Sequence, residues 1–232
     1  DDIPAFGKKL AKEVYDPSGE RNFAVKPAGD HANVTANKQW GKAVQAYLAT
    51  ISFADAQIGR VLDALDRSGH ADNTIVVLWG DHGWHLGEKE HWRKHALWDV
   101  STRTPLIFSA PRGVAKDKLC HRPVSLIDIY PTLIDLCGLP KREGLDGQSL
   151  KPLLQNPEVK WERPAVITYG LNNHAVQTER WRYIRYRDGG QELYDHERDP
   201  NEWTNLAFIP KYSPQKTKLS KWLPSTNGEP KK

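Results

Sequence analysis

The sequence predicts an α/β fold, in which part of a doubly wound mixed sheet flanked by helices is followed by a small antiparallel sheet. Apolar residues recur at helical spacing over 39–68, and an apolar, β-branched run follows at 75–79. Past residue 160 the chain changes to short runs rich in Val, Ile, Tyr and Trp, which are typical of antiparallel strands. We therefore expect an α/β domain over 1–160 and a small antiparallel subdomain with a helical or disordered tail over 161–232.

The composition is that of an ordinary globular protein. The 232 residues can bury a sizeable core, and the two cysteines are too few for a disulfide scaffold and wrongly spaced for a zinc knuckle. A formal net charge of +4 suits an anionic partner, such as a sulfated sugar or a nucleic acid, or only a solvated basic surface. No apolar run approaches the ~18 residues that cross a bilayer, so we expect no membrane span. The opening residues 1–4 lack the basic and apolar regions of a signal peptide.

The first part of the chain is predicted to be a covering segment followed by one long helix. A short helical pattern begins at Phe6 and ends at Val14, and turn signals follow at 16–19 and 27–29. The long amphipathic helix over 39–68 ends at Gly69, a residue that suits a helix C-cap.

Two apolar runs predict strands of the main sheet. The run at 75–79 is apolar enough to be buried on both faces of a parallel sheet, and 105–108 supplies a second strand. A helix is expected between them and the small sheet, because Ser125 and Asp128 match a capping box and Gly138 suits its end.

Four short strands are expected in the small subdomain, at 165–169, 174–178, 180–186 and 191–195. The Asp-Gly-Gly sequence at 188–190 suits a hairpin turn between the last two strands. A weak helix is expected near 217–222 in the tail.

A polar turn, Gly80-Asp81-His82-Gly83, follows the first predicted strand. Open α/β sheets bind ligands in the crevice beyond the carboxyl ends of their strands, and the two glycines free the backbone to turn there. Asp next to His at such a place is typical of a site for a hard cation or a phosphate-type group. A plain tight turn with a capping Asp is the alternative.

The stretch over 74–94 resembles the second signature region of the sulfatases. After Asp81-His82-Gly83 come Trp84, Leu-Gly-Glu at 86–88 and Trp-Arg-Lys at 92–94. Sulfatases are formylglycine-dependent sulfate-ester hydrolases of the alkaline-phosphatase-like superfamily, and this version of the motif looks most like iduronate-2-sulfatase and its bacterial relatives. Glu-Leu-Tyr-Asp at 192–195 is similar to the C-terminal subdomain of the family. The resemblance covers nearly the whole chain but only about the C-terminal half of a sulfatase.

The resemblance implies roles for three residues. Asp81 and His82 would be ligands of Ca²⁺, although calcium rarely takes imidazole and His82 could instead face the sulfate or the nucleophile. Lys94 would place a positive charge on a sulfate oxygen or near the leaving group, as a catalytic and substrate-binding residue. The alternative for Lys94 is a solvated surface lysine.

Other side chains of this region carry weaker hypotheses. His85, His91 and His95 could form a zinc site with His82 but lack a supporting ligand pair, so we expect them to line the pocket. Three tryptophans could stack on a sugar ring or simply pack: Trp84, Trp92 and Trp98. Three residues before or in a strand of the small sheet could contact substrate or form a plain turn: Asn172, Asn173 and His174.

No nucleophile of the family is found. Cys120 and Cys137 do not match the Cys/Ser-x-Pro/Ala-x-Arg signature that is converted to formylglycine, and Asp1-Asp2 lack the buried strand that precedes the family's metal-binding aspartates. We therefore expect the nucleophile on a missing N-terminal half and no activity from this chain alone. An isolated half would expose apolar surface and associate. The family also implies an extracytoplasmic location, which is periplasmic, secreted or lysosomal.

Two rival functions remain open. A phosphodiesterase or phosphatase of the same superfamily would use the same metal and oxyanion chemistry. A non-catalytic module could bind an anionic glycan or nucleic acid through aromatic and basic residues of one segment: Trp181, Arg182, Tyr183, Arg185 and Tyr186. Between the possible partners we expect a sulfated carbohydrate or other sulfate ester, and no nucleic acid.

Overall fold

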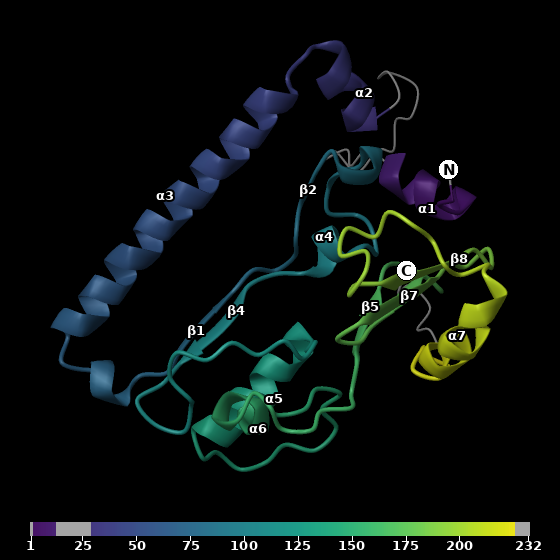
Figure 1. Cartoon of the computed structure of the whole chain (residues 1–232). Coiled ribbons are helices and arrows are strands. Elements are labelled where there is room, and N and C mark those ends of the chain that lie inside the picture. Colours follow the sequence, from purple (N-terminus) through teal and green to yellow (C-terminus); the bar gives the residue numbers. More distant parts are fainter. Residues whose placement is uncertain (1, 13–28, 226–232) are drawn as a thin grey trace, which may run out of the picture.

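The computed structural model describes residues 2–12 and 29–225, which form a chain of helices and antiparallel sheets (Figure 1). In order, the elements are α1 (Ala5–Lys12), α2 (Gly29–Ala36), α3 (Trp40–Arg67), η1 (Ala71–Asn73), β1 (Val76–Trp79), β2 (His85–Leu86), η2 (Glu88–Glu90), β3 (Trp92–Arg93), α4 (Asp99–Thr102), β4 (Leu106–Ser109), η3 (Leu126–Asp128), α5 (Ile129–Leu136), α6 (Lys151–Gln155), β5 (Ala165–Thr168), β6 (His174–Gln177), β7 (Trp181–Arg185), β8 (Gln191–Asp195), η4 (Pro210–Tyr212) and α7 (Ser213–Ser220). The predicted turns at 16–19 and 27–28 and the end of the first helix lie outside the described residues.

The long helix α3 confirms the predicted helix but buries no residue in the described part of the chain. Several of its apolar side chains are exposed to solvent: Leu48 is 56% exposed, Ile51 49% and Val61 68%. Figure 1 shows α3 running along one side of the chain, apart from β1 and β4. An apolar stripe of this length on a helix surface is normally covered by another element.

The strands β1 and β4 lie at the predicted places but pair differently from the prediction. They are antiparallel, with Val76 opposite Ser109 and Trp79 opposite Leu106. Trp79 is 50% exposed and Ile107 54%. The expectation that β1 is buried on both faces of a parallel sheet is therefore wrong in this chain. A parallel neighbour usually needs a crossover through a helix that spans the sheet, whereas residues 80–105 form the short β2–β3 hairpin and the four-residue α4 and return the chain antiparallel beside β1.

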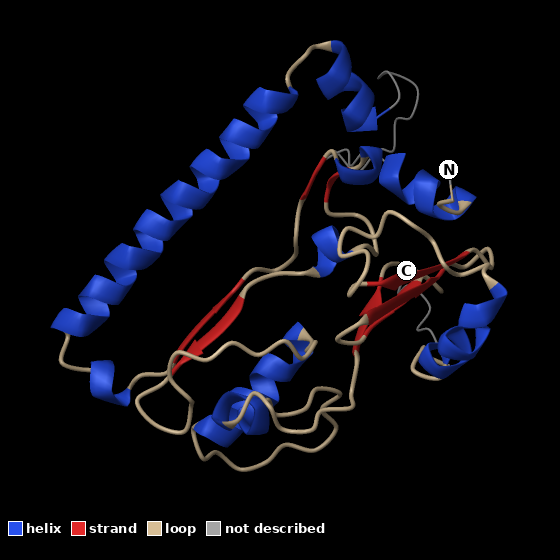
Figure 2. Ribbon diagram, viewed as in Figure 1, coloured by secondary structure: helices blue, strands red, loops and turns tan. Residues whose placement is uncertain are grey.

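Helices α5 and α6 lie beside the β1–β4 pair, below it in the view of Figure 1 and Figure 2. The predicted capping box is present, since Ser125 and Asp128 bond each other's backbone at the start of η3. An open apolar groove of about 530 Å³ separates Trp79 from the α5 region and is lined by residues such as Tyr130 and Leu145. In the described residues, none of the helices combines the length and apolar character that a bilayer crossing requires.

The small sheet confirms the predicted antiparallel subdomain, with β5, β6, β7 and β8 in sequence order. Side chains of β6, β7 and β8 alternate between two buried clusters, as the two-residue period of a strand requires. One cluster holds Ala175, Ile184 and Tyr194 together with Leu97 and Trp98. The other holds Val176, Tyr183 and Leu193 together with residues of α7 and its neighbours. Both faces of this sheet are therefore covered, and the segment that follows Lys94 covers one of them.

Candidate functional site

The polar turn after β1 is held against the start of β4 by backbone contacts. Gly80 N donates to Pro105 O at 3.1 Å and Gly83 N donates to Ser101 O at 2.9 Å. A Cβ on Gly83 would lie 1.9 Å from Val100 O, so only glycine allows this approach. The turn is thus fixed by its neighbours and presents Asp81 and His82 at the strand end.

The structure brings three predicted site residues together. His82 Nε2 lies 3.1 Å from Asp81 Oδ2, and Lys94 Nζ lies 2.8 Å from the same Nε2. The Asp81 side chain is 80% exposed and that of His82 is 27% exposed. The cluster is therefore open to a ligand from solvent or from another segment.

The donor set of this cluster suits a cation. His82 Nδ1 lies 2.9 Å from Gly83 O, a partner that fixes the proton on Nδ1 and leaves a lone pair on Nε2. The Lys94 ammonium takes that lone pair at 2.8 Å, so the exposed Asp81 carboxylate is the group of this cluster that is left to meet a further cation. Ca²⁺ takes six to eight ligands, mainly oxygen. Residues 2–12 and 29–225 hold no cluster of three or more His, Cys, Asp or Glu side chains suited to a metal. Asp81 therefore fits as part of a ligand set only, and His82 could join it only by giving up Lys94.

Aromatic rings back the cluster. Trp84 stacks on His82 with ring centroids 6.1 Å apart, and Tyr47 of α3 stacks on the indole at 6.3 Å. Trp84 therefore supports the imidazole directly. No sequence pattern indicated the contribution of Tyr47, because it lies on a different element. Trp92 and Trp98 are 8% and 1% exposed, so they pack rather than offer a sugar-stacking surface.

His85 and His91 are packed and do not line an open pocket as expected, whereas His95 is half-buried. His85 and His91 are 0% and 2% exposed, and their ring centroids lie 4.7 Å apart beside Trp98. His95 lies against Tyr169, at 5.6 Å between ring centroids. The zinc hypothesis gains no ligand cluster from the described residues.

The burial of His85 predicts a pH dependence of stability. Burial, together with neighbouring His91, lowers the pKa of His85 from 6.5 to about 3. The folded state therefore favours the neutral ring, and the stability this provides is complete above pH 6.5 and is lost as the pH falls toward 3. We expect His85 alone to lower the free energy of unfolding by about 3 kcal/mol between pH 7 and pH 4. Urea unfolding at the two pH values checks this.

The variant His85→Phe is the control for this effect. Neither ring nitrogen of His85 has a well-formed hydrogen bond among the described residues, and its nearest polar neighbour is Glu88, with Oε2 3.8 Å from Nδ1. An apolar ring should therefore fit at little cost at pH 7. The variant should lose less stability than the wild type on acidification. Equal losses in both proteins would contradict the assignment to His85.

His174 lies in a different environment from the cluster. It is 1% exposed on β6, and Nδ1 lies 2.9 Å from Thr168 Oγ1. Asn173 is 3% exposed and its amide donates to Tyr169 O and Leu171 O. Both side chains organise the loop before β6, which leaves their predicted contact with substrate without support. Asn172 is exposed in the same loop, with a φ of 61°.

Most of the side chains named for the rival binding module are buried. Arg182, Tyr183 and Tyr186 are 1%, 3% and 3% exposed. The alternation of β7 sends these side chains into the two cores of the small sheet, so they cannot form a platform for a glycan or a nucleic acid.

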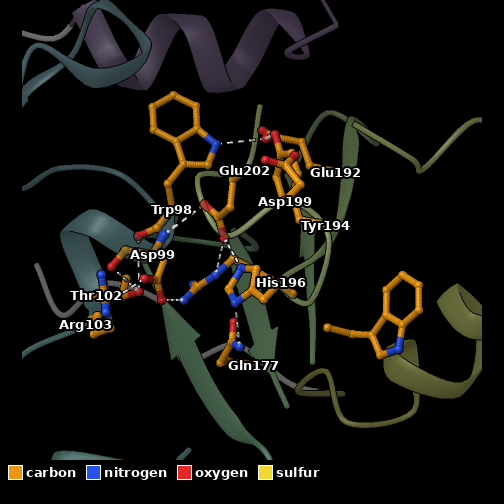
Figure 3. A network of polar contacts seen from close by, with 12 residues as sticks. Trp98, Asp99, Thr102, Arg103, Gln177, Glu192, Tyr194, His196, Asp199 and Glu202 are labelled. Carbon is orange, nitrogen blue, oxygen red and sulfur yellow. Dashed lines mark hydrogen bonds and ion pairs between the residues drawn. The ribbon is translucent and has the colours of Figure 1, made fainter. Parts of the chain in front are cut away.

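A buried network that the sequence did not reveal joins the site segment to the small sheet (Figure 3). Arg182 donates to Leu97 O and Asp99 Oδ1, both at 2.9 Å, and its Nε lies 2.7 Å from Glu202 Oε1. Asp99 N donates to Glu202 Oε2 at 3.0 Å, and His196 Nε2 lies 2.8 Å from Glu202 Oε1. The position of residues 97–99 is thus set by side chains of the C-terminal part.

Comparison with known proteins identifies the family. The sulfatase family model matches residues 7–139, and the model of the C-terminal region of N-sulphoglucosamine sulphohydrolase matches residues 87–228. A sulfatase of Formosa agariphila is 43% identical over 97% of this chain and 42% of its own length.

Solved structures agree with this result. One protein, determined in complex with its substrate D-glucosamine-2-N,6-O-disulfate, is 28% identical with a TM-score of 0.64 over 75% of this chain and 38% of its own. Phosphonate monoester hydrolase of Agrobacterium radiobacter is 27% identical with a TM-score of 0.64 over 74% of this chain and 38% of its own. The chain spans less than half the length of each of these relatives. With a family model matching more than half of its residues, this chain belongs to the sulfatase family.

Proposed function

We propose that this chain is the C-terminal portion of a sulfuric-ester hydrolase that acts on sulfated carbohydrates, and that it is closest in type to iduronate-2-sulfatase. The observation that carries the proposal is the cluster in which His82 Nε2 lies within 3.1 Å of Asp81 and 2.8 Å of Lys94. The match of residues 87–228 to a C-terminal sulfohydrolase region supports it, as does the likeness to a protein whose substrate is a sulfated glucosamine.

The residues have separate roles in this proposal. Asp81 would hold Ca²⁺ together with ligands from another segment, and the bound cation would polarise the sulfuryl oxygens. His82, whose Nε2 lone pair accepts from Lys94, would face the sulfate. The Lys94 ammonium, held by the His82 ring, would neutralise charge on a sulfate oxygen or near the leaving group. His174 is left out, because its side chain is buried against Thr168.

The nucleophile belongs to a part of the protein outside this chain. Neither Cys120 nor Cys137 lies in a formylglycine signature, and both are exposed and free of a disulfide. We therefore propose that a partner segment with formylglycine completes the site, that the chain alone does not turn over sulfate esters, and that the protein works outside the cytoplasm.

Reconstitution tests the proposal. The chain is co-expressed with the remaining segment of the Formosa agariphila sulfatase and a formylglycine-generating enzyme, and sulfate release and calcium content are measured. Activity should appear in the complex only. Asp81→Ala should remove activity and calcium, and Lys94→Ala should lower kcat/KM by about 10²–10³-fold with calcium retained.

Two exposed residues away from the cluster, Asp72 and Lys160, supply matched controls. Asp72→Ala and Lys160→Ala should leave both sulfate release and calcium content unchanged. A folded complex that binds no calcium and releases no sulfate would reject the proposal.

A second candidate function is phosphonate or phosphate ester hydrolysis. The likeness to a phosphonate monoester hydrolase, at a TM-score of 0.64, favours it. The same complex is assayed with a phenyl phosphonate monoester and with a sulfated monosaccharide. Faster turnover of the phosphonate, in terms of kcat/KM, would move this candidate to the front.

A further inference from the structure

The segment just before Lys94 has an uncommon backbone conformation. Between β2 and β3, Lys89 has a φ of 54° and Glu90 of 58°, and Arg93 at the end of β3 has a φ of 70°. Residues with a Cβ seldom adopt this left-handed region, and three of them so close together require contacts from outside to hold the conformation. Lys94 follows this turn directly and reaches His82 at 2.8 Å.

Lys89 provides the contact from outside the turn. Its ammonium donates to Glu202 O and, at 3.2 Å, to Tyr194 Oη. The same nitrogen lies 5.0 Å from the ring centroid of Trp98 and 4.6 Å from that of Tyr194. A cation over two aromatic faces with two acceptors is well fixed. The anchor therefore ties the turn to β8 and to the loop at residue 202.

A buried carboxylate interacts electrostatically with this ammonium. Glu192 is 0% exposed and accepts hydrogen bonds from Trp98 Nε1 at 2.8 Å, from Tyr186 Oη at 2.6 Å and from Tyr194 Oη, part of which Figure 3 shows. Burial raises the pKa of Glu192, whereas these bonds and the charge of Lys89 act to lower it. Lys89 is thus both an anchor and a charge that acts on Glu192.

We propose that Lys89 is a positioning residue, which anchors the 87–93 turn to the C-terminal sheet so that the ammonium of Lys94 is held against His82. The inference rests on the proposed function for its consequence in catalysis, but the anchoring itself does not. It gives the small sheet a part in shaping the sulfate site, although the sheet supplies no group to the Asp81, His82 and Lys94 cluster.

The single variant Lys89→Met would leave Glu192 buried without its facing cation and could unfold the chain for that reason. The test therefore uses Lys89→Met combined with Glu192→Gln, which removes both charges, and compares it with Glu192→Gln alone. The control variant Glu192→Gln keeps the Lys89 ammonium, whose charge still interacts with Glu202 and Asp199. Lys89→Arg, which keeps a cation and its donors, is the rescue variant.

Amide hydrogen exchange on the full chain measures directly how firmly Lys89 holds the 87–93 turn. In the double variant the amides of Gly87, Glu90 and His91, which bond within the turn, should exchange about tenfold faster than in Glu192→Gln. The β6 and β7 amides should keep their rates, and Lys89→Arg should exchange like the wild type. Equal turn rates in the double variant and in Glu192→Gln would overturn the proposal.

The kinetics of the reconstituted enzyme provide the second test of the proposal. The double variant should lower kcat about tenfold relative to Glu192→Gln with KM changed much less, because a displaced Lys94 acts on the transition state more than on binding. An unchanged kcat would overturn the catalytic consequence. If the wild-type complex is itself inactive, the proposed function fails, and the exchange rates still decide the anchor by themselves.

Discussion

Replacing Arg182 by Met is expected to lower the free energy of unfolding by about 3–5 kcal/mol, because it leaves buried charges without their partner. The guanidinium is 2% exposed and lies between Asp99 Oδ1, at 2.9 Å, and Glu202 Oε1, at 2.7 Å. Burial raises the pKa of the Glu202 carboxyl, yet Arg182, His196 and the Asp99 N–H outweigh it and hold that pKa below its usual range. The carboxylate therefore stays charged, and Met would offer it no donor.

Urea unfolding followed by far-ultraviolet circular dichroism measures this loss, and an unchanged slope with urea would show that the denatured state is unaffected. Arg103→Met is the matched control. Arg103 Nε also lies 2.8 Å from Asp99, but its side chain is 77% exposed. Water screens that pair, so the control should cost no more than about 1 kcal/mol. Similar losses in both variants would mean that burial of Arg182 does not decide its contribution.

The elements of this fold follow closely from local patterns. The helix predicted over 39–68 is observed over Trp40–Arg67, and the last predicted strand, 191–195, is observed without a shift. Such elements are set by periodicity and by turn residues that lie next to each other in the sequence. The expected burial of β1 within a parallel sheet was wrong for the described residues, because strand pairing depends on the path of the intervening chain and not on the apolar run itself.

The residues of the candidate site could likewise be predicted only in part from the sequence. Asp81, His82 and Lys94 could be named from one short motif, and the structure brings them together. The supports of that motif could not be named, because Lys89 meets Tyr194 and Glu202 across 105 and 113 positions of sequence. Buried polar contacts of this range leave no periodic trace. The same limit explains His174, whose place before a strand did not reveal its burial against Thr168.

Substituting Gly83 by Ala is expected to destabilise the chain by about 3 kcal/mol and to separate the site residues. The added Cβ would lie 1.9 Å from Val100 O and 2.8 Å from Arg103 O, and backbone atoms cannot move aside as a flexible side chain can. Since Gly83 N bonds Ser101 O and Gly83 O bonds the His82 ring, relief of the overlap must shift the imidazole. In the reconstituted complex we therefore expect a loss of sulfate release comparable with that of Lys94→Ala.

Gly59→Ala is the control that isolates this overlap from the general effect of replacing glycine. Gly59 lies within α3, and a Cβ there meets nothing within 4 Å. Alanine is the better helix former, so this variant should be about 0.5–1 kcal/mol more stable than the wild type in urea, with activity unchanged. Opposite signs for the two variants would show that the approach of the turn to Val100 holds His82 in place. A Gly83→Ala protein as stable and as active as the wild type would contradict that role, and the His82 geometry would then have to depend on Asp81, Trp84 and Lys94.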